Sequence, residues 1–328
     1  MGDLDAKQWI NLAGSKGART ATSRQNATGL DVFAEGRLFV TDSFAIVGGG
    51  AYGRAVREYQ SYAPSAIIVA DDKAYDWFAP RAGFISQNDQ GAQIYANITR
   101  SLEPPNFSAL APTTGGFQPL KAQDAWTGEI GTRGRAAKLI WDVAYYRAEI
   151  EHELLAYSVN AALGIPAATF NALDGTMHQG IEAGLDWQIT EGLRLRQTYM
   201  WSDFRFTGDR QYGDNRLPVV PEHLYRAELK WTAPGGFWIA PSIEWSIADV
   251  WVDFANTFTA PAYSVANLSA GKDFDRVSLF LDVRNLTDER YISNVTPLTN
   301  YQTTAAAGRA VFFPGDERSV FAGAALKF

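Results

Sequence analysis

The sequence predicts an all-β protein, an antiparallel transmembrane β-barrel of about 14 strands. Three observations lead to this fold class. Apolar and polar side chains alternate through many segments of roughly ten residues, as they do along strands whose two faces meet different surroundings. The connections between these segments are alternately short and long. No apolar run approaches the roughly 20 residues of a transmembrane helix, which excludes a helical membrane protein.

The composition narrows the classes of function. The 328 residues are 46% hydrophobic and only 20% charged, and the formal net charge of −7 gives no support for nucleic-acid binding, which needs a basic face. The chain has no cysteine, which excludes disulfides, cysteine-ligated zinc and cysteine nucleophiles. Its first residues include acidic side chains and lack the apolar stretch of a secretory signal, so we expect no signal peptide in this sequence.

The alternation is clear in residues 30–40. Leu30, Val32 and Leu38 share one face of the predicted strand, while Asp31 and Glu35 share the other. The apolar face fits lipid, and the charged face fits ion pairing along a polar lumen. The same pattern recurs at 181–190, 225–231, 239–247 and 277–284.

These patterns and the turn signals between them place about 14 strands. We expect strands at 6–14, 27–41, 43–58, 74–87, 92–103, 122–132, 136–150, 175–190, 192–206, 222–232, 236–248, 262–273, 276–287 and 317–328. Short links are expected near 41–42, 88–91, 133–135, 191–192, 233–235 and 273–275, and long links near 15–26, 59–73, 104–121, 151–174, 207–221, 249–261 and 288–316. A short helix is predicted within 152–164. Transmembrane barrels alternate in this way, because their periplasmic turns are short and their extracellular loops long.

Tryptophans on the apolar face favour a membrane setting over a soluble one. They are typical of the aromatic girdles at the two membrane interfaces. Alternation alone fits a soluble β-sandwich as well, with one face in a core and the other in water. The alternating link lengths decide for the barrel. The tryptophans concerned are Trp141, Trp187, Trp201, Trp231 and Trp245.

Five local sequences resemble a known family, the TonB-dependent outer-membrane receptors. LDVRNLTDERYISNV (281–295) resembles their penultimate strand, with its Asn-Leu-x-Asp-x-x-Tyr signature. FFPGDERSVFAGAALKF (312–328) resembles their last loop and last strand, and residues 78–107 resemble a mid-barrel hairpin. Residues 181–190 and 217–231 resemble further strands in the same order, so the match runs from about residue 27 to the end.

The resemblance implies an outer-membrane protein of a Gram-negative bacterium. Such receptors have a signal peptide, a TonB box, an N-terminal plug domain and a 22-stranded barrel. Residues 1–328 contain no plausible plug, and we expect them to form one domain, the C-terminal portion of the barrel, without the plug and about eight strands. Because unpaired strand edges are very costly in lipid, either the missing strands are supplied elsewhere or the 14 strands close on themselves.

Catalytic and metal chemistry find no support in the sequence. The three histidines lack metal-ligand spacing, and His178 beside Met177 and Asp174 is expected to be a polar loop or lumen residue. No serine lies in a GxSxG context. The glycine-rich stretch 46–53 lacks the Lys-Ser/Thr ending of a phosphate loop. We therefore expect no cofactor, no metal site and no enzymatic activity.

Arginines and tyrosines of the long loops are the candidate ligand-binding residues. Arginine pairs with carboxylates and other oxyanions, and aromatic rings supply contact area, which together suit an anionic metal chelate. The alternative is that these side chains are merely solvated or contact lipopolysaccharide phosphates. The candidates are Arg54, Arg57, Tyr59 and Tyr62 near the loop 59–73, Arg210, Tyr212 and Arg216 in the loop 207–221, and Tyr301 and Arg309 in the last long loop.

By the resemblance, we expect TonB-dependent uptake of a metal chelate, most simply a ferric siderophore, captured by the extracellular loops. Cobalamin, other metals and glycans remain open as substrates. The implied partners are outer-membrane lipid and lipopolysaccharide, the barrel-assembly machinery, which reads the terminal Phe328, and the TonB complex, reached only through a plug. Asn285, Asp288 and Tyr291 are expected to be structural, capping the strand exit.

Two alternative functions stay open from the sequence. A passive, porin-like channel of 14 strands would use the same barrel without TonB. A soluble β-rich binding protein would use the alternation for a core.

Overall fold

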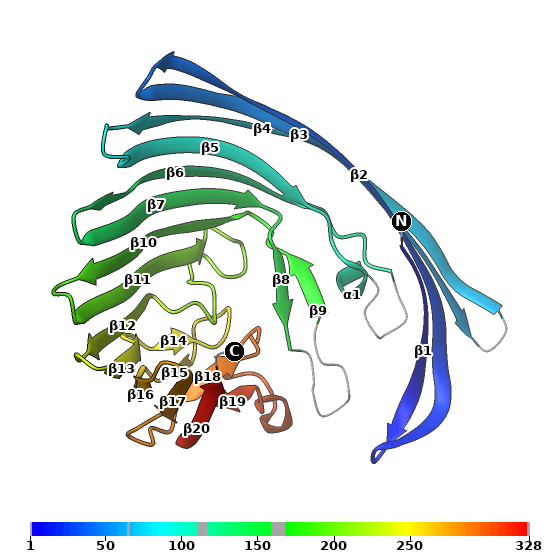
Figure 1. Cartoon of the computed structure of the whole chain (residues 1–328). Coiled ribbons are helices and arrows are strands. Elements are labelled where there is room, and N and C mark those ends of the chain that lie inside the picture. Colours follow the sequence, from blue (N-terminus) through cyan, green and yellow to red (C-terminus); the bar gives the residue numbers. More distant parts are fainter. Residues whose placement is uncertain (1, 64–65, 111–116, 159–167, 327–328) are drawn as a thin grey trace.

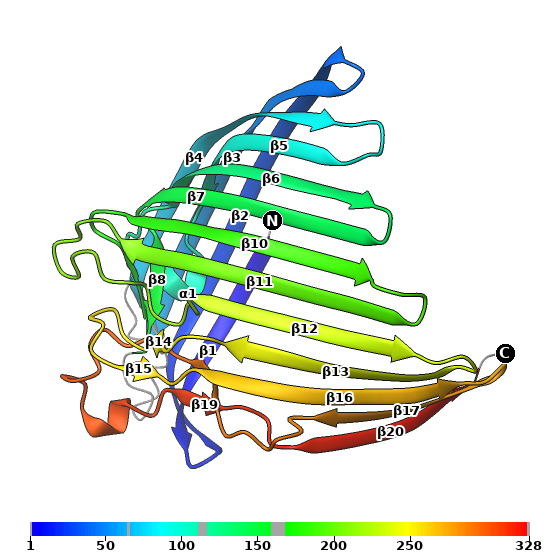
Figure 2. The ribbon, with the colours of Figure 1, turned by 90° about the vertical axis from the view of Figure 1, so that its left-hand side faces the viewer.

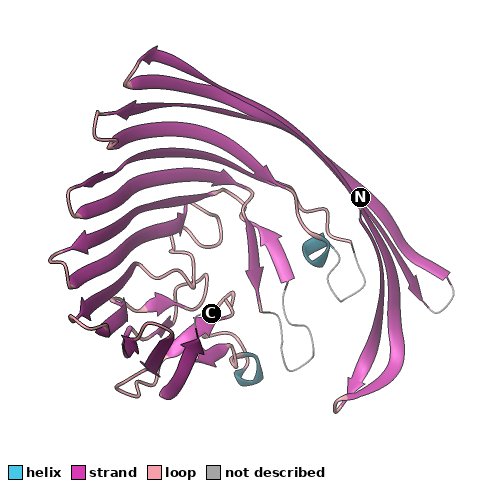
Figure 3. Cartoon of the chain, viewed as in Figure 1, coloured by secondary structure: helices cyan, strands magenta, loops and turns pink. Residues whose placement is uncertain are grey.

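The computed structural model describes residues 2–63, 66–110, 117–158 and 168–326. Within them, one antiparallel sheet of 14 strands contains most of the chain, and each strand pairs with the next sheet strand in the sequence (Figure 1, Figure 3). The strands in sheet order are β1 (Gly2–Leu12), β2 (Ser15–Thr41), β3 (Phe44–Ala63), β4 (Ala66–Gln87), β5 (Gln93–Glu103), β6 (Gln123–Ala136), β7 (Leu139–Glu151), β10 (Thr176–Gln188), β11 (Leu193–Phe206), β12 (His223–Thr232), β13 (Phe237–Ser246), β16 (Tyr263–Asp273), β17 (Val277–Arg284) and β20 (Ser319–Leu326).

The remaining elements are short and lie in the connections. They are the hairpin of β8 (Leu154–Tyr157) and β9 (Ala168–Asn171), the pair β14 (Val250–Trp251) and β15 (Thr259–Ala260), the pair β18 (Ile292–Val295) and β19 (Phe312–Pro314), the helix α1 (Phe107–Leu110) and the 3-10 turn η2 (Ala306–Gly308). No helix in the described ranges is long and apolar enough to cross a membrane.

The sheet curves into an open trough (Figure 1). Its first and last strands, β1 and β20, are not paired with each other, so the described strands do not close on themselves. The strand β1 pairs only with the first part of β2, up to Ala27. Residues 28–41 of β2 therefore form one edge of the trough, and β20 forms the other.

The two ends of the sheet differ, as the link lengths predict. The connections at one end, here called the turn end, are tight turns between β2 and β3, β4 and β5, β6 and β7, and their successors. The opposite end, here called the loop end, carries α1, the β8–β9 hairpin and the small pairs of strands. Figure 2 shows the turns on the right and the elaborated loops on the left.

Three expectations about the connections are wrong. The segments 15–26 and 59–73 are largely strand instead of loop, because β2, β3 and β4 run for 27, 20 and 22 residues. A barrel strand needs only about 9–11 residues to cross a bilayer, so these hairpins continue well beyond it. Residues 15–26 are polar on both faces, which resembles a loop in the sequence but equally fits a strand in water, whereas 59–73 contains the apolar run 66–70, which does not alternate. The helix expected at 152–164 is also wrong where it is described, since 154–157 is β8; residues 159–167 lie outside the described part.

The register assigns the side chains to two faces. Tyr59 is buried and stacks on Phe117, in the connection between β5 and β6. The helix α1 of this connection lies in the hollow of the trough (Figure 1), so the face that carries Tyr59 is the inner one. Strand by strand, the pairing then places Leu30, Val32 and Leu38 on the outer face, where each is more than half exposed. Glu35 falls on the inner face and receives Arg81 from two strands away at 3.0 Å.

Ion pairs cross the inner face along the sheet, as the charge alternation predicts. Arg194 contacts Asp186 at 2.5 Å, and Arg226 contacts Glu244 at 2.7 Å on the neighbouring strand. Tyr263 donates to the same Glu244 at 2.9 Å. The inner wall is thus a polar lattice in which charges are matched between adjacent strands.

The loops at the loop end pack into a hydrophobic core of their own. Two clusters contribute, and they share the loop between β13 and β16. The first contains Leu155, Ala172, Phe206, Tyr212, Leu217 and Phe254. The second contains Val252, Ala260, Val295, Leu298 and Val311. Burial of these apolar side chains orders long segments that would otherwise be mobile.

Asp253 holds the two clusters together. Its side chain is fully buried, and its Oδ1 accepts hydrogen bonds from the N–H groups of Thr257 at 2.8 Å and Phe258 at 3.2 Å. Its Oδ2 accepts from the Thr257 hydroxyl at 2.5 Å and from the N–H of Tyr301, in the last long loop, at 2.8 Å. The backbone continues this link, since Phe254 donates to the carbonyl of Leu298 at 3.0 Å.

Asn285 closes the exit of β17, in agreement with the expectation for the motif 285–291. It has a left-handed backbone (φ 48°), and its side chain donates to the carbonyls of Glu289 at 2.8 Å and Asp316 at 2.9 Å. Tyr291 lies against Tyr263 with ring centroids 4.6 Å apart. A Cβ added at Gly315 would come within 2.1 Å of the Tyr291 ring, so only glycine fits there.

We expect Asp253→Ala to destabilise the loop-end core by about 3 kcal/mol, because four donors lose their acceptor in a buried site. Hydrogen exchange of residues 252–258 and 298–301 in detergent should accelerate strongly. The control is Asp249→Ala, which removes an exposed carboxylate of the same loop whose hydrogen bonds go to Thr259 and Ala262, outside the two segments measured, so the exchange of these segments should change little. Equal protection in the two variants would contradict the role assigned to Asp253.

A second prediction separates two contributions of Asn285 to stability, the strain of its backbone and the hydrogen bonds of its side chain. Asn285→Ala loses three hydrogen bonds and places a Cβ residue in the left-handed region, so it should cost about 2–4 kcal/mol. Asn285→Gly loses the same bonds without the backbone strain, so it should cost about 1 kcal/mol less. Thermal unfolding in detergent measures the difference, and an identical cost for the two variants would refute the strain contribution.

Candidate functional site

The first four candidate residues lie in strand β3 and not in a loop. Because side chains alternate along a strand, they point to opposite faces. Arg54 and Tyr62 are on the outer face, and Arg57 and Tyr59 are on the inner face. Arg54 and Arg57 lie within the strand expected at 43–58, whereas Tyr59 and Tyr62 continue this strand instead of starting the loop expected at 59–73.

The outward pair is occupied by neighbours on the same face. Arg54 contacts Asp76 at 3.1 Å, and the Tyr52 hydroxyl donates to the same carboxylate at 3.0 Å. The Tyr62 hydroxyl donates to the side-chain carbonyl of Gln60 at 2.7 Å. These side chains face away from the hollow of the trough.

The inward pair lies under the connection between β5 and β6. Tyr59 is buried and stacks on Phe117, with ring centroids 6.1 Å apart. The Tyr75 hydroxyl donates to the carbonyl of Leu120 at 3.0 Å, which fixes the same connection. Arg57 is half-buried and donates only to the carbonyl of its neighbour Val56, at 3.2 Å.

The three candidates of the loop 207–221 are all tied into the protein. Tyr212 is buried in the loop-end core, and burial raises the pKa of its hydroxyl. Arg210 reaches Asp174 at 3.2 Å, and hydrogen bonds from its side chain and its backbone hold the pKa of that carboxyl below its usual range. Arg216 forms two hydrogen bonds with Glu222, one of them at 2.8 Å.

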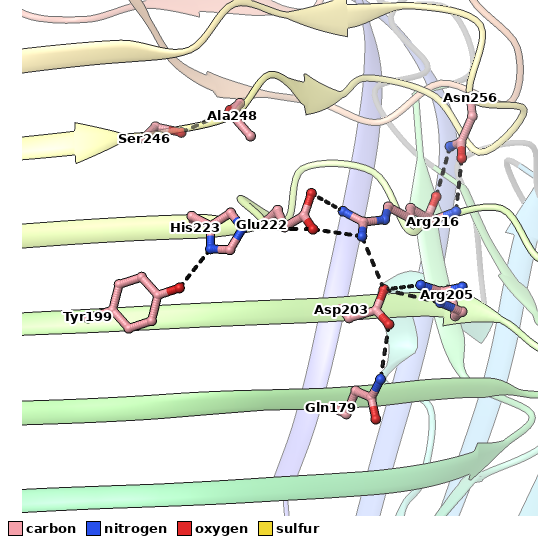
Figure 4. A network of polar contacts seen from close by, with 10 residues as sticks. All are labelled: Gln179, Tyr199, Asp203, Arg205, Arg216, Glu222, His223, Ser246, Ala248 and Asn256. Atoms are coloured by element: carbon pink, nitrogen blue, oxygen red, sulfur yellow. Dashed lines mark hydrogen bonds and ion pairs between the residues drawn. The ribbon is translucent and has the colours of Figure 1, made fainter.

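Figure 4 shows the network around Arg216. Asp203, almost fully buried, accepts from Arg205 at 2.6 Å and from Gln179 at 3.1 Å, and lies 3.6 Å from Arg216. The hydrogen bond from Arg216 lowers the pKa of Glu222. The network matches two arginines with two carboxylates, so it holds the loop in place and leaves no free cation.

Tyr301 and Arg309, the candidates of the last long loop, come together. The Arg309 guanidinium lies over the Tyr301 ring, 4.9 Å from its centroid. The Tyr301 ring also stacks on the Phe258 ring, with centroids 4.1 Å apart. Arg309 also donates to the carbonyls of Thr304 at 2.8 Å and Gln302 at 2.9 Å. Both candidates are partly exposed, and Arg309 has no carboxylate partner in the described ranges.

His178 is a wall residue at the loop end of β10. Its ring stacks on Phe204 with centroids 4.0 Å apart, and its Nε2 lies 3.2 Å from Glu153, which also accepts from the Thr176 hydroxyl. No group of three or more histidine, cysteine, aspartate or glutamate side chains in the described part of the chain could hold a metal ion.

Sequence reasoning missed Lys73, which lies directly opposite Arg57 in the register of β3 and β4. Both side chains are half-buried on the inner face. Charged and aromatic residues occupy every second position from Lys73 to Trp77, which places them on one face, but only if this segment is interpreted as a strand. Phe328 lies outside the described residues.

The chain matches a protein family over most of its length. The family described as TonB dependent receptor-like, beta-barrel, matches residues 3–286. Among curated proteins, the ferrichrome outer membrane transporter/phage receptor of Escherichia coli K12 is 22% identical over 99% of this chain and 41% of its own length. The ferrioxamine receptor of Yersinia enterocolitica is 21% identical over 68% of this chain and 31% of its own length.

Solved structures agree on the fold. The ferric yersiniabactin uptake receptor of Yersinia pestis has a TM-score of 0.76 at 17% identity, covering 99% of this chain and 49% of its own. The ferric citrate transporter in its unliganded form has a TM-score of 0.77 at 15% identity, covering 96% and 47%. The chain thus spans less than half the length of these relatives. It belongs to the family of TonB-dependent receptor-like β-barrels.

Proposed function

We propose that residues 1–328 are a barrel-domain portion of an outer-membrane receptor for TonB-dependent uptake of a metal chelate, with a ferric siderophore as the first candidate. The loop end would face the outside of the cell and capture the chelate. The observation that carries the proposal is the packed loop end, in which Asp253 and two apolar clusters hold aromatic and arginine side chains in place.

An ordered loop end suits capture better than passive flow. Fixing long loops costs conformational entropy when the protein folds. Loops that are already ordered lose less entropy when a ligand binds, so the affinity is higher. The relatives support the same class, since they include receptors for ferrioxamine, ferrichrome and ferric yersiniabactin. Transport coupled to TonB would require a plug domain in addition to these strands.

The geometry reduces the nine candidates to three. Arg54, Arg210 and Arg216 are neutralised by carboxylates, and Tyr212 belongs to the loop-end core. We retain Arg57, Tyr301 and Arg309 as ligand contacts, because they are partly exposed and their cations lack an ionic partner among the described residues. The outward ion pairs such as Arg54 with Asp76 are better placed for outer-membrane lipid and lipopolysaccharide.

A passive channel is the second candidate function. The ion-paired inner wall favours it, because a lattice of matched charges such as Arg194 with Asp186 and Arg226 with Glu244 would suit a water-filled lumen. Conductance of the purified chain in planar bilayers, with no chelate binding, would support the channel over the receptor.

Binding by the last loop is tested with Tyr301→Ala combined with Arg309→Gln. Tryptophan-fluorescence titration of the full chain in detergent with ferric siderophores should show at least a tenfold loss of affinity, because an aromatic contact and a charge-assisted hydrogen bond are removed. Arg290→Gln, an exposed cation of the same loop, is the control and should bind normally. Unchanged affinity in the double variant would exclude Tyr301 and Arg309 as contacts.

Phe328 is proposed as the assembly signal, on the family resemblance. Deleting it should lower the yield of heat-modifiable, membrane-inserted barrel several-fold in a Gram-negative host. Phe321→Ala, which changes an aromatic residue within β20, is the control and should leave the terminal signal intact. A normal yield of the deletion variant in the outer-membrane fraction would refute this role.

A further inference from the structure

Arg57 and Lys73 form an unusual pair of like charges. They are cross-strand partners on the inner face of the β3–β4 hairpin, both half-buried, with Ala27 opposite Arg57 on the next strand. Directly opposed like charges destabilise a sheet. In the described part of the chain neither makes an ion pair, and the only hydrogen bond of the Arg57 side chain goes to the adjacent carbonyl of Val56.

Six other arginines toward the loop end are treated differently, because each has a carboxylate within ion-pair distance, on its own strand, on a neighbouring strand or in a nearby loop. These arginines are Arg54 with Asp76, Arg100 with Asp124, Arg147 with Glu149, Arg205 with Asp203, Arg210 with Asp174 and Arg216 with Glu222. Arg309 also lacks a carboxylate partner among the described residues, but it donates to two backbone carbonyls. Two cations directly opposed in the register, with no anion within ion-pair distance in the described ranges, are therefore an exception to the way this protein places charge.

The surroundings of the pair are aromatic and partly closed. One step toward the turn end, the buried Tyr75 anchors the connection between β5 and β6 through Leu120. One step further, Trp77 covers Gly53, where an added Cβ would lie 2.0 Å from the indole. On the other side of the pair, Tyr59 stacks on Phe117 of the same connection.

Two buried polar atoms in this region have no hydrogen-bond partner among the described residues. They are the hydroxyl oxygen of Ser61, on the inner face of β3, and the side-chain carbonyl oxygen of Gln118, next to Phe117. Buried polar atoms without partners are costly and call for an explanation such as a missing ligand. Ser61 lies two steps along the inner face from Arg57, so a polar ligand that reached both would supply charge to the cations and hydrogen bonds to the strand.

We propose that Arg57 and Lys73 bind an anionic group of the transported chelate, such as a free carboxylate. The inference rests on the proposed function and names the charge of its substrate. Arg57 can grip a carboxylate with two N–H groups, and Lys73 adds a compact charge from the opposite strand. The anion cancels the repulsion between the two cations, and the aromatic shell reduces screening by water.

The pair therefore selects chelates by charge. An anionic chelate such as ferric citrate gains both contacts, whereas ferrioxamine B, which carries an ammonium group and no free carboxylate, meets two like charges. We expect the wild-type chain to bind ferric citrate at least tenfold more tightly than ferrioxamine B.

The binding test uses the full chain in detergent and quenching of tryptophan fluorescence by the two iron chelates. Arg57→Gln combined with Lys73→Gln should weaken ferric citrate binding at least tenfold, and Arg57→Lys combined with Lys73→Arg should retain most of it. The control is Arg37→Gln, which removes an exposed cation from the same face near the turn end and should bind normally.

A second measurement does not depend on iron. In buffer without multivalent anions, Lys73→Gln should raise the melting temperature, since it removes the repulsion. Citrate should raise the melting temperature of the wild type but not of Lys73→Gln, with sodium chloride at equal ionic strength as the reference.

The outcomes separate this inference from the proposed function. Tight binding of ferrioxamine B that the double variant leaves unchanged would overturn the anion pair and leave the receptor standing. Binding of neither chelate, together with no citrate effect on melting, would overturn the pair and count against the receptor as well.

Discussion

The structure depends above all on pairing of backbone hydrogen-bonding groups between strands. In hydrocarbon no water can satisfy an exposed N–H or C=O group, so a membrane sheet must give every strand a partner on both sides. The interior strands from β3 to β17 meet this requirement at membrane depth through continuous antiparallel ladders. The exceptions are residues 28–41 of β2 and the strand β20, whose outer ladders are open, and residues 66–80 of β4, which lie beyond the ladder to β5. The position of every side chain, inner or outer, follows from these ladders.

The loop end is built on a different principle from the sheet. There the backbone is irregular, and order comes from apolar burial around Phe206 and Phe254 and from the acceptor Asp253. Several arginines in this part are neutralised by carboxylates, as in the pair of Arg216 with Glu222. Arg57 and Lys73 differ from these, because no ionic partner among the described residues accounts for their charge.

The sequence predicted the sheet best where one face meets lipid. Around Leu30 and Leu281 the alternation identifies both strand and face, and the motif 285–291 identifies the strand exit, since these signals are local. The alternation fails at 15–26, where both faces of the strand are polar, and at 59–73, where the apolar run 66–70 does not alternate. This error affected the prediction of the site most, because Arg57 and Lys73 are neighbours only through the register of two strands. The burial of Tyr212 could not be predicted either, since it depends on packing against Phe254, far away in the sequence.

The composition of the loop-end core also determines when it can form. Its members span the chain from Leu155 to Val311 and come from four separate connections, so the complete core forms only when the strands from β7 to β17 are side by side, although near neighbours such as Phe206 and Tyr212 can meet earlier. Contacts between such distant segments form slowly, because the intervening chain must be ordered first. The loop-end core is therefore a late step of assembly. Until that step, Phe206, Phe254 and Leu298 form exposed hydrophobic surface that chaperones and proteases can recognise.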